Sequence, residues 1–214
     1  MISDEVLEFL KTAFTEYNKL VGKDYLIACY VNKNFPLEFY VFRIKKENFR
    51  HLLGCECNEI TAEELYNIHM NGDDNIQEYL TYTANIHACR EKYTVFMRLF
   101  NFIDKAKEIR ISKTDGSPEQ YAFKMAVGNY SGVIGYDSKN SDILFPKSVR
   151  LKTIDSINAN SMRIAFILSK AINEYSFDNA DYCVSKKLFT KMLAELPDRF
   201  NSSFKKKEQM NDNS

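Results

Sequence analysis

The stretch YLIACYV-NKNFP-LEFYVFRI, residues 25–44, places two apolar runs on either side of a polar turn. Residues 25–31 form a short apolar run that is typical of a buried strand. Residues 32–36 contain the Asn and Pro that favour a turn. Residues 37–44 are rich in aromatic and branched side chains, which alternate between two largely apolar faces. The stretch therefore predicts a β-hairpin that is covered on both faces.

The segment before this hairpin predicts an amphipathic helix. Ser3 is a favourable N-cap, and the acidic residues Asp4 and Glu5 suit the positive end of a helix dipole. Apolar residues then recur at helical spacing as far as Val21. We expect Gly22 to end this helix in the C′ position.

Helices are also predicted after the hairpin. Residues 45–54 form a basic amphipathic segment. Thr61 and Glu64 have the T-x-x-E spacing of a capping box, so a helix is expected to begin at Thr61 and to end at Gly72. A long helix with a stripe of buried aromatic residues is expected over about residues 75–106.

The second half of the chain predicts strands joined by short turns, one of them around residues 116–118. The strands are expected over residues 121–127, 133–136, 143–145, 162–169 and 182–184. We expect Pro146 to end the third of them, and residues 188–196 to form a last helix. Short turns favour antiparallel pairing. The sequence therefore predicts a single α+β domain over residues 1–204, followed by a polar tail over residues 205–214.

The overall charge gives no support for strong, sequence-independent binding of nucleic acid. The 214 residues carry a formal net charge of +0, with a pI of about 6.8. Any RNA site would therefore depend on local basic clusters. The nearest such cluster to the hairpin contains Lys45, Lys46 and Arg50.

The cysteines and the N-terminus indicate a protein of the cytoplasm. The five cysteines are odd in number and form no C-x-x-C pair, which is typical of free thiols in a reducing compartment. The N-terminus has no apolar segment of the kind found in signal peptides. No apolar run approaches the roughly 20 residues of a membrane span.

The motifs of metal and nucleotide sites are absent from the sequence. There is no H-E-x-x-H pair, no phosphate-binding glycine loop and no tight group of carboxylates. We therefore expect neither a metal nor a cofactor, which leaves acid–base catalysis by side chains as the enzymatic option.

Among the three histidines, His51 has the most suggestive surroundings, because it lies within the basic cluster. Nearby cations disfavour the imidazolium form and would leave a neutral base near pH 7. The alternative is a surface histidine in a basic turn. His69 and His87 lie in predicted helices, where a structural or solvated role is expected.

Two further segments contain groups that suit a phosphate. Lys147 and Ser148 follow Pro146, and a cation next to a hydroxyl can hold a phosphate by charge-assisted hydrogen bonds. The alternative there is a solvated loop. Arg98 lies in the long predicted helix, where it is either an exposed cation or the partner of an anion.

Taken together, these segments resemble a known nuclease group. The sequence FRIKKENFRHLLG, residues 42–54, resembles the F-x-H-L-[TI]-G signature of phage-associated barnase/EndoU/colicin/RelE-like nuclease domains, and is closest to their fourth subfamily. Arg98 in its helix, and residues 128–148 with their Pro-x-Ser turn, agree in order with the same family. Cys55 stands where the family has Leu. The resemblance spans roughly residues 20–185.

The resemblance implies a metal-independent ribonuclease from a mobile element, with helices packed on a curved, mainly antiparallel sheet. It implies that His51 is the acid or base and that Arg98 and Ser148 are active-site residues. Lys147 joins this set because it is next to Ser148. Lys45, Lys46 and Arg50 would bind RNA, and Tyr130 or Tyr136 would stack on a base. For both tyrosines the alternative is a place in the core.

A different class of function fits the same sequence. A nuclease-like fold without activity would bind RNA or a protein, for example as an inhibitor. A toxin with a separate antitoxin protein is a third option, in the cytoplasm of a bacterial or phage-infected cell. Convergence of His51, Arg98 and Ser148 in one cleft would favour catalysis.

Overall fold

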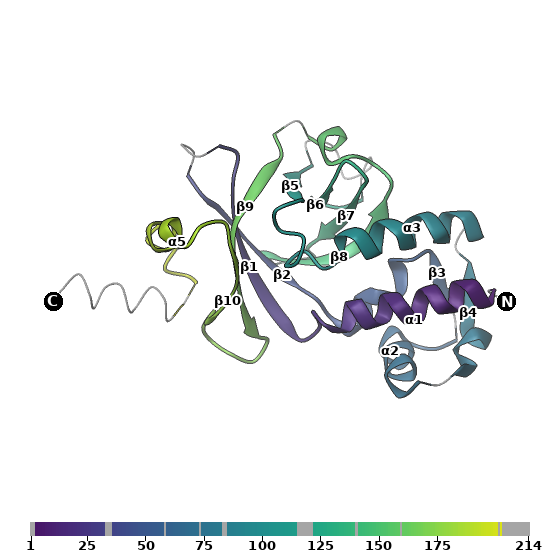
Figure 1. Cartoon of the computed structure of the whole chain (residues 1–214). Helices are drawn as coiled ribbons and strands as arrows, with labels where there is room; N and C mark the ends of the chain where they lie inside the picture. The colour runs from purple at the N-terminus through teal and green to yellow at the C-terminus, as the bar shows by residue number, and fades with distance from the viewer. Residues whose placement is uncertain are drawn as a thin grey trace.

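The hairpin predicted from residues 25–44 is present in the computed structural model (Figure 1). Strand β1 (Lys23–Tyr30) pairs with β2 (Glu38–Arg43) in antiparallel register, with Leu26 opposite Val41. The structure describes residues 3–32, 36–57, 59–72, 74–82, 85–114, 122–139, 141–158, 160–200 and 202. Only the backbone is described for Arg50, His51, Cys57, Asp74, Asn75, Gln77, Tyr82, Lys187 and Leu188.

The large sheet closes on itself. Its further strands are β5 (Arg110–Lys113), β6 (Met125–Asn129), β7 (Gly132–Asp137), β8 (Ile143–Arg150), β9 (Met162–Ala171) and β10 (Asn179–Cys183). They lie in the order β1-β2-β8-β7-β6-β5-β9-β10, and β9 also pairs with β1. Only the β2–β8 pair is parallel among these pairings. The fold is therefore α+β with a curved, mainly antiparallel sheet, as predicted.

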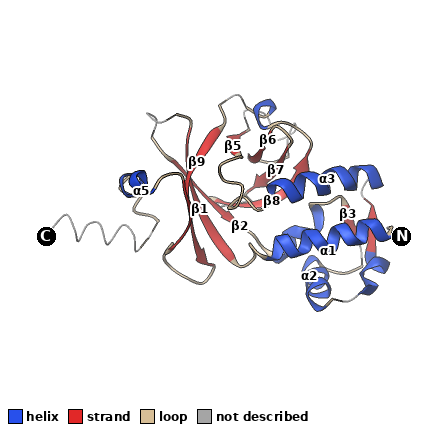
Figure 2. Ribbon diagram, in the orientation of Figure 1, coloured by secondary structure: helices blue, strands red, loops and turns tan. Residues whose placement is uncertain are grey.

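Helices cover the sheet from two sides, as Figures 1 and 2 show. On one side lie α1 (Asp4–Asn18), α2 (Ala62–Asn71), α3 (Ile86–Leu99) and the short helices η1 (Lys46–His51) and η2 (Asp74–Tyr79). The strands β3 (Cys55–Cys57) and β4 (Leu80–Tyr82) pair beside them. On the opposite side lies α5 (Lys186–Leu193), while η3 (Ile154–Ser156) packs against β5 and β6. The caps predicted for α1 and α2 are confirmed, including the capping box and the left-handed Gly72.

The two faces of the hairpin belong to different cores. Phe42 joins a main core that includes Tyr17 of α1, Phe96 of α3 and Tyr136 of β7. Val41 joins an outer cluster under α5. A second outer cluster contains Phe123, Ala126, Val133, Ile154 and Ile157. The prediction that both faces are covered is confirmed, because burial of apolar area on both sides stabilises the sheet.

The prediction of one long helix over residues 75–106 was wrong. The segment is divided into η2, β4 and α3, and turns follow α3. Leu80 pairs with Cys57 in the small sheet, and the side chain of Asn85 accepts a hydrogen bond from the Ala88 N–H to cap a new helix. Strand pairing and a local cap therefore outweigh helical periodicity here.

Two further local predictions were wrong. Helix α1 ends at Asn18, and Gly22 instead lies just before β1, where its N–H donates to the Ile44 carbonyl at 3.2 Å. Pro146 does not end a strand, because β8 runs through it to Arg150. A β-bulge at this point removes the need for a donor at proline. The predicted turn at residues 116–118, Tyr121 and the polar tail lie outside the described residues.

No helix in the described part of the chain is long and apolar enough to span a membrane.

Because His69 is buried, we expect the protein to lose stability in mild acid. Its ring stacks on Phe14 with 4.7 Å between centroids, and its buried Nε2 has no hydrogen-bond partner among the described residues. Burial, with Lys11 nearby, lowers its pKa to about 4. The unfolded chain takes up this proton near pH 6.5, so stability is lost as the pH falls from about 6.5 to about 4. We expect a loss of about 2 kcal/mol at pH 5 from this group.

Urea unfolding at pH 7 and at pH 5 measures this effect. His69→Phe should reduce the difference between the two pH values, because it removes the proton uptake. An unchanged difference in the variant would assign the acid sensitivity to other groups.

Candidate active site

The segment that carries His51 is fixed to the main core. Phe49 is buried, with its ring centroid 5.0 Å from that of Tyr17 and 5.5 Å from that of Phe14. The Tyr17 hydroxyl donates to the Lys45 carbonyl at 2.5 Å, where η1 begins. Leu52 and Leu53, which directly follow η1, are also buried. The backbone of His51 is therefore held between two anchors, while its side chain lies outside the described residues.

The basic cluster on η1 is exposed and only weakly paired. Lys45 Nζ lies 3.4 Å from Glu47, and Lys46 Nζ lies 3.9 Å from Glu63 and 5.4 Å from the centre of the Tyr66 ring. Exposed ion pairs of this kind contribute about 0–1 kcal/mol. Both lysines are therefore available to an anionic chain at small cost. The side chain of Arg50 lies outside the described residues.

Arg98 lies on the solvent side of α3. It is exposed in the last turn, whereas its neighbour Leu99 is buried. In the part of the chain that the structure describes, no ion pair of Arg98 with a carboxylate occurs. Of the two alternatives for Arg98, the structure favours an exposed cation.

Ser148 and Lys147 lie on the β-bulge of β8. Pro146 is opposite Tyr136 and Ser148 is opposite Gly135, so Lys147 is the extra residue. Lys147 Nζ forms an ion pair with Asp137 at 2.7 Å. The Ser148 hydroxyl is buried and has no hydrogen-bond partner among the described residues.

The β7–β8 ladder separates Ser148 from α3. A Cβ atom at Gly135, opposite Ser148, would lie 2.3 Å from the Phe123 ring of an outer cluster. A Cβ atom at Gly132 would instead lie 2.6 Å from Val95 of α3. Directly opposed residues share a face and neighbours along a strand alternate. Ser148 therefore lies on the face away from α3, so the structure does not bring Ser148 and Arg98 into one cleft. Lys147, the bulge residue, reaches the same face through its ion pair with Asp137, which is two residues from Gly135 on β7.

The two tyrosines predicted to stack on bases differ in exposure. Tyr130 is 85% exposed at the tip of the β6–β7 hairpin, so its ring is accessible. Tyr136 is 0% exposed and its ring makes an edge contact with Phe42 at 4.7 Å. Burial raises its pKa. The prediction that Tyr136 binds RNA was wrong, because its ring fills the main core.

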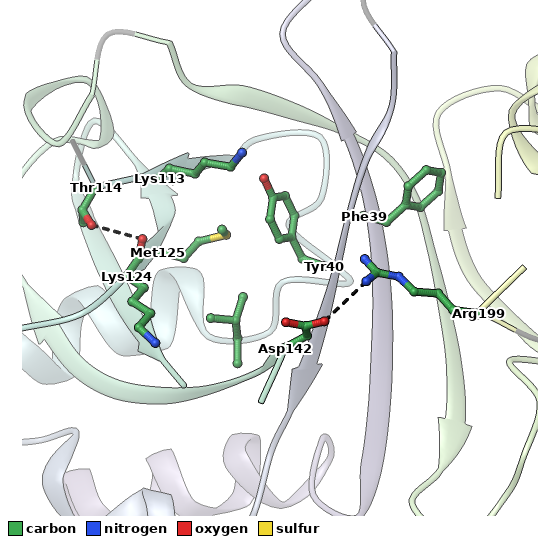
Figure 3. A pocket seen from close by; sticks show the side chains of 9 residues that line it. Phe39, Tyr40, Lys113, Thr114, Lys124, Met125, Asp142 and Arg199 are labelled. Carbon is green, nitrogen blue, oxygen red and sulfur yellow. Dashed lines mark hydrogen bonds and ion pairs between the residues drawn. The ribbon is translucent and has the colours of Figure 1, made fainter. Parts of the chain in front are cut away.

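A groove gathers four cations from distant parts of the chain, of which the sequence singled out only Lys147. Two adjoining cavities of about 490 Å³ each share Thr114 and Lys124, and we call them together the Lys124 groove. Figure 3 shows the first cavity, where Lys113, Lys124 and Arg199 come from distant parts of the chain. Lys147 lines the second cavity. No local sequence signal joins these residues, because only the tertiary fold brings them together.

The cations of the Lys124 groove differ in their partners. Lys113 pairs with Glu38 at 2.5 Å, and Arg199 pairs with Asp142 at 3.4 Å. Lys124 Nζ instead bonds the carbonyl and hydroxyl oxygens of Ser138, at 2.8 and 2.9 Å. The charge of Lys124 also acts on Asp137 of the same groove: against the opposing effect of burial, the hydrogen bond from Lys147 and the nearby charge of Lys124 lower the pKa of that carboxyl.

The cysteines whose side chains the structure describes are not linked by disulfides. Cys29, Cys55, Cys89 and Cys183 are free thiols, as predicted. Within the described ranges, no group of three or more His, Cys, Asp or Glu side chains is placed to hold a metal ion.

Comparison with known proteins identifies the family. No curated protein and no solved structure matches the chain. A family model described as phage-Barnase-EndoU-ColicinE5/D-RelE like nuclease4 matches residues 10–186. The match covers η1, α3 and all the strands of the closed sheet. The chain therefore belongs to the fourth phage-associated family of barnase/EndoU/colicin/RelE-like nucleases.

Proposed function

We propose that the protein is a metal-independent endoribonuclease in which His51 transfers the proton. The observation that carries the proposal is the family match, together with the position of His51 in the F-x-H-L-x-G sequence on an anchored η1. An imidazole on a rigid backbone loses little entropy when it meets a substrate. The exposed lysines of η1 supply positive charge beside it.

The reaction is a transesterification at phosphorus. A base removes the proton of a ribose 2′-OH, and the 2′-oxygen forms a bond to the adjacent phosphorus. The bond from phosphorus to the 5′-oxygen breaks, and an acid protonates the leaving oxygen. The products are a 2′,3′-cyclic phosphate and a 5′-hydroxyl. Cations near the phosphate stabilise the negative charge of the transition state.

We assign His51 to the proton transfer and Arg98 to charge stabilisation. Lys147 and Ser148 receive a different role from the one that the sequence predicted, because they lie on the face away from α3. We assign Lys147 to the Lys124 groove, where it would hold a neighbouring part of the RNA. Ser148 would support the same bulge.

Cleavage in the presence of EDTA tests the reaction class. Purified protein is expected to cut single-stranded RNA as fast in excess EDTA as without it. Mass spectrometry of the fragments should find 2′,3′-cyclic phosphate ends. DNA of the same sequence should remain whole, because it lacks the attacking hydroxyl. Loss of activity in EDTA that Mg²⁺ restores would contradict the proposal.

A second candidate function is binding without catalysis. The separation of Arg98 and Ser148 by the β7–β8 ladder favours it, because these two groups do not line one cleft. RNA that is bound but left whole, at any pH from 5 to 9, would support a binding or inhibitor module. A toxin-type ribonuclease would instead arrest growth when expressed in bacteria, and an antitoxin protein would relieve the arrest.

A further inference from the structure

Two arginines lie directly opposite each other in the large sheet. Arg110 of β5 is the partner of Arg163 of β9 in the antiparallel register. Directly opposed side chains share one face and begin about 5 Å apart, and like charges in this arrangement are destabilising. Ile111 and Met162, the adjacent residues on the two strands, are buried in the main core. Because neighbours alternate along a strand, both arginines lie on the outer face.

A cavity surrounds this pair of arginines. Tyr30 of β1 is opposite Arg163 on the other edge of β9, so Tyr30, Arg163 and Arg110 form a row across three strands. These three residues line a cavity of about 180 Å³, together with Lys107 and Tyr182. A single water needs only about 10–15 Å³ of such space, so a phosphate group fits. We call this cavity the Arg163 pocket.

No carboxylate of the described residues neutralises the cations of the Arg163 pocket. None of the described residues that line it is acidic. Lys107 and Arg163 form no ion pair within the described part of the chain, and Arg110 donates only to the neutral Ile109 carbonyl, at 3.3 Å. In the Lys124 groove, by contrast, carboxylates pair with three of the four cations. The positive charge of the Arg163 pocket is therefore available to an anion from solution.

The two tyrosines of the pocket add hydrogen-bond donors. Neither Tyr30 nor Tyr182 forms a side-chain hydrogen bond within the described residues. Burial raises the pKa of Tyr182, so its hydroxyl keeps its proton at neutral pH. A guanidinium group forms two parallel hydrogen bonds to the oxygens of a phosphate or a carboxylate. A phosphate has enough oxygens to accept from both arginines and from a phenol at once, which favours it over a carboxylate.

We propose that the Arg163 pocket binds a phosphate group, which Arg110 and Arg163 hold between them while Lys107 adds positive charge. The phosphate comes either from the backbone of an RNA chain or from a small phosphate compound. The first source rests on the proposed function, whereas the second does not. The pocket contains none of the residues assigned to the cleavage reaction, so it is a binding site apart from the reacting phosphorus.

Thermal unfolding with inorganic phosphate tests the pocket directly. Phosphate should raise the melting temperature of the native protein more than sodium chloride of equal ionic strength does. Arg163→Gln and Arg110→Gln should each weaken phosphate binding about tenfold, as expected for the loss of one charge-assisted contact. Without phosphate, each variant should melt at the native temperature or higher, because the opposed charges are gone. The matched control is Arg150→Gln, since Arg150 is an exposed arginine opposite Val133, and it should keep the full shift.

A 2′-O-methyl RNA oligomer distinguishes the two sources of phosphate. Its blocked 2′-oxygen prevents cleavage, so binding is measured whether or not the protein is a nuclease. If the pocket holds an RNA phosphate, Arg163→Gln should weaken binding of this oligomer and lower its salt dependence by about 0.7 in slope. Binding equal to that of the native protein, together with a lost shift in inorganic phosphate, would assign the pocket to a small phosphate compound.

The outcomes for the pocket and for the nuclease are separable. A phosphate shift that depends on Arg110 and Arg163, in a protein that cuts no RNA, would keep the pocket and reject the nuclease. RNA cleavage by a protein whose phosphate shift is the same in both variants would keep the nuclease and overturn the inference. A clear fall in the melting temperature of either variant without phosphate would also overturn it, because the arginine would then have a structural partner.

Discussion

His51→Ala is expected to reduce the rate of RNA cleavage by about two to four orders of magnitude, which is the usual contribution of a positioned acid or base. The backbone of His51 is anchored by Phe49 before it and by Leu52 and Leu53 after it, all buried. Removing the imidazole should therefore leave η1 in place. The measurement is the single-turnover rate on a short RNA, with the melting temperature of the variant as a check on folding.

His87→Ala is the matched control for this substitution. His87 is exposed in the first turn of α3, and its removal should change neither the rate nor the melting temperature by much. A loss confined to His51→Ala assigns the proton transfer to that residue. Cleavage by folded His51→Ala at the native rate would remove His51 from the role and leave the binding module as the better explanation.

Gly128→Ala is expected to cost the fold about 3 kcal/mol or more, at the upper end of the range for overpacking. A Cβ atom at Gly128 would lie 2.2 Å from the Gly132 carbonyl oxygen and 2.8 Å from Val133 Cα. Both are backbone atoms of the paired strand, with Gly128 opposite Val133 in the register. A backbone contact cannot rotate away as a side chain does, so β6 and β7 would have to separate. Urea unfolding measures the loss.

Gly72→Ala is the comparison that separates lack of space from backbone strain. Gly72 has a φ of +68° and no atom within 4 Å of a built Cβ, so its substitution should cost only about 1–2 kcal/mol. Gly128 has no positive φ, so the cost of substituting it comes from lack of space alone. A Gly128→Ala protein as stable as the native one would contradict the register of the β6–β7 hairpin.

The parts of the fold that the sequence predicted correctly depend on neighbours in the chain. Ser3, Thr61 and Glu64 form their caps with backbone groups three residues away. The hairpin of β1 and β2 needs only a turn and the alternation of its own residues. Local hydrogen bonds and periodicity depend only on residues that are close together in the sequence, so these features could be inferred from the chain alone.

The parts that were missed depend on partners far along the chain. Pro146 lies inside β8 because a bulge opposite Gly135 and Tyr136 accommodates it, and the predicted helix over residues 75–106 is interrupted by pairing of Leu80 with Cys57. The pairing of β7 with β6 and β8 likewise decides that Tyr136 faces the main core. Such contacts depend on which distant strands pair with one another. Short-range patterns in the sequence do not contain that information.

The sequence by itself determined the class of the fold, the caps, the two-faced hairpin and the His51 segment that carries the family signature. Only the tertiary structure decided which face of the sheet each polar group occupies. One residue of bulge at Lys147 turns Ser148 towards the outer face. The reason is physical: side chains alternate along a strand, so a shift of a single residue changes the face on which a group meets its ligand.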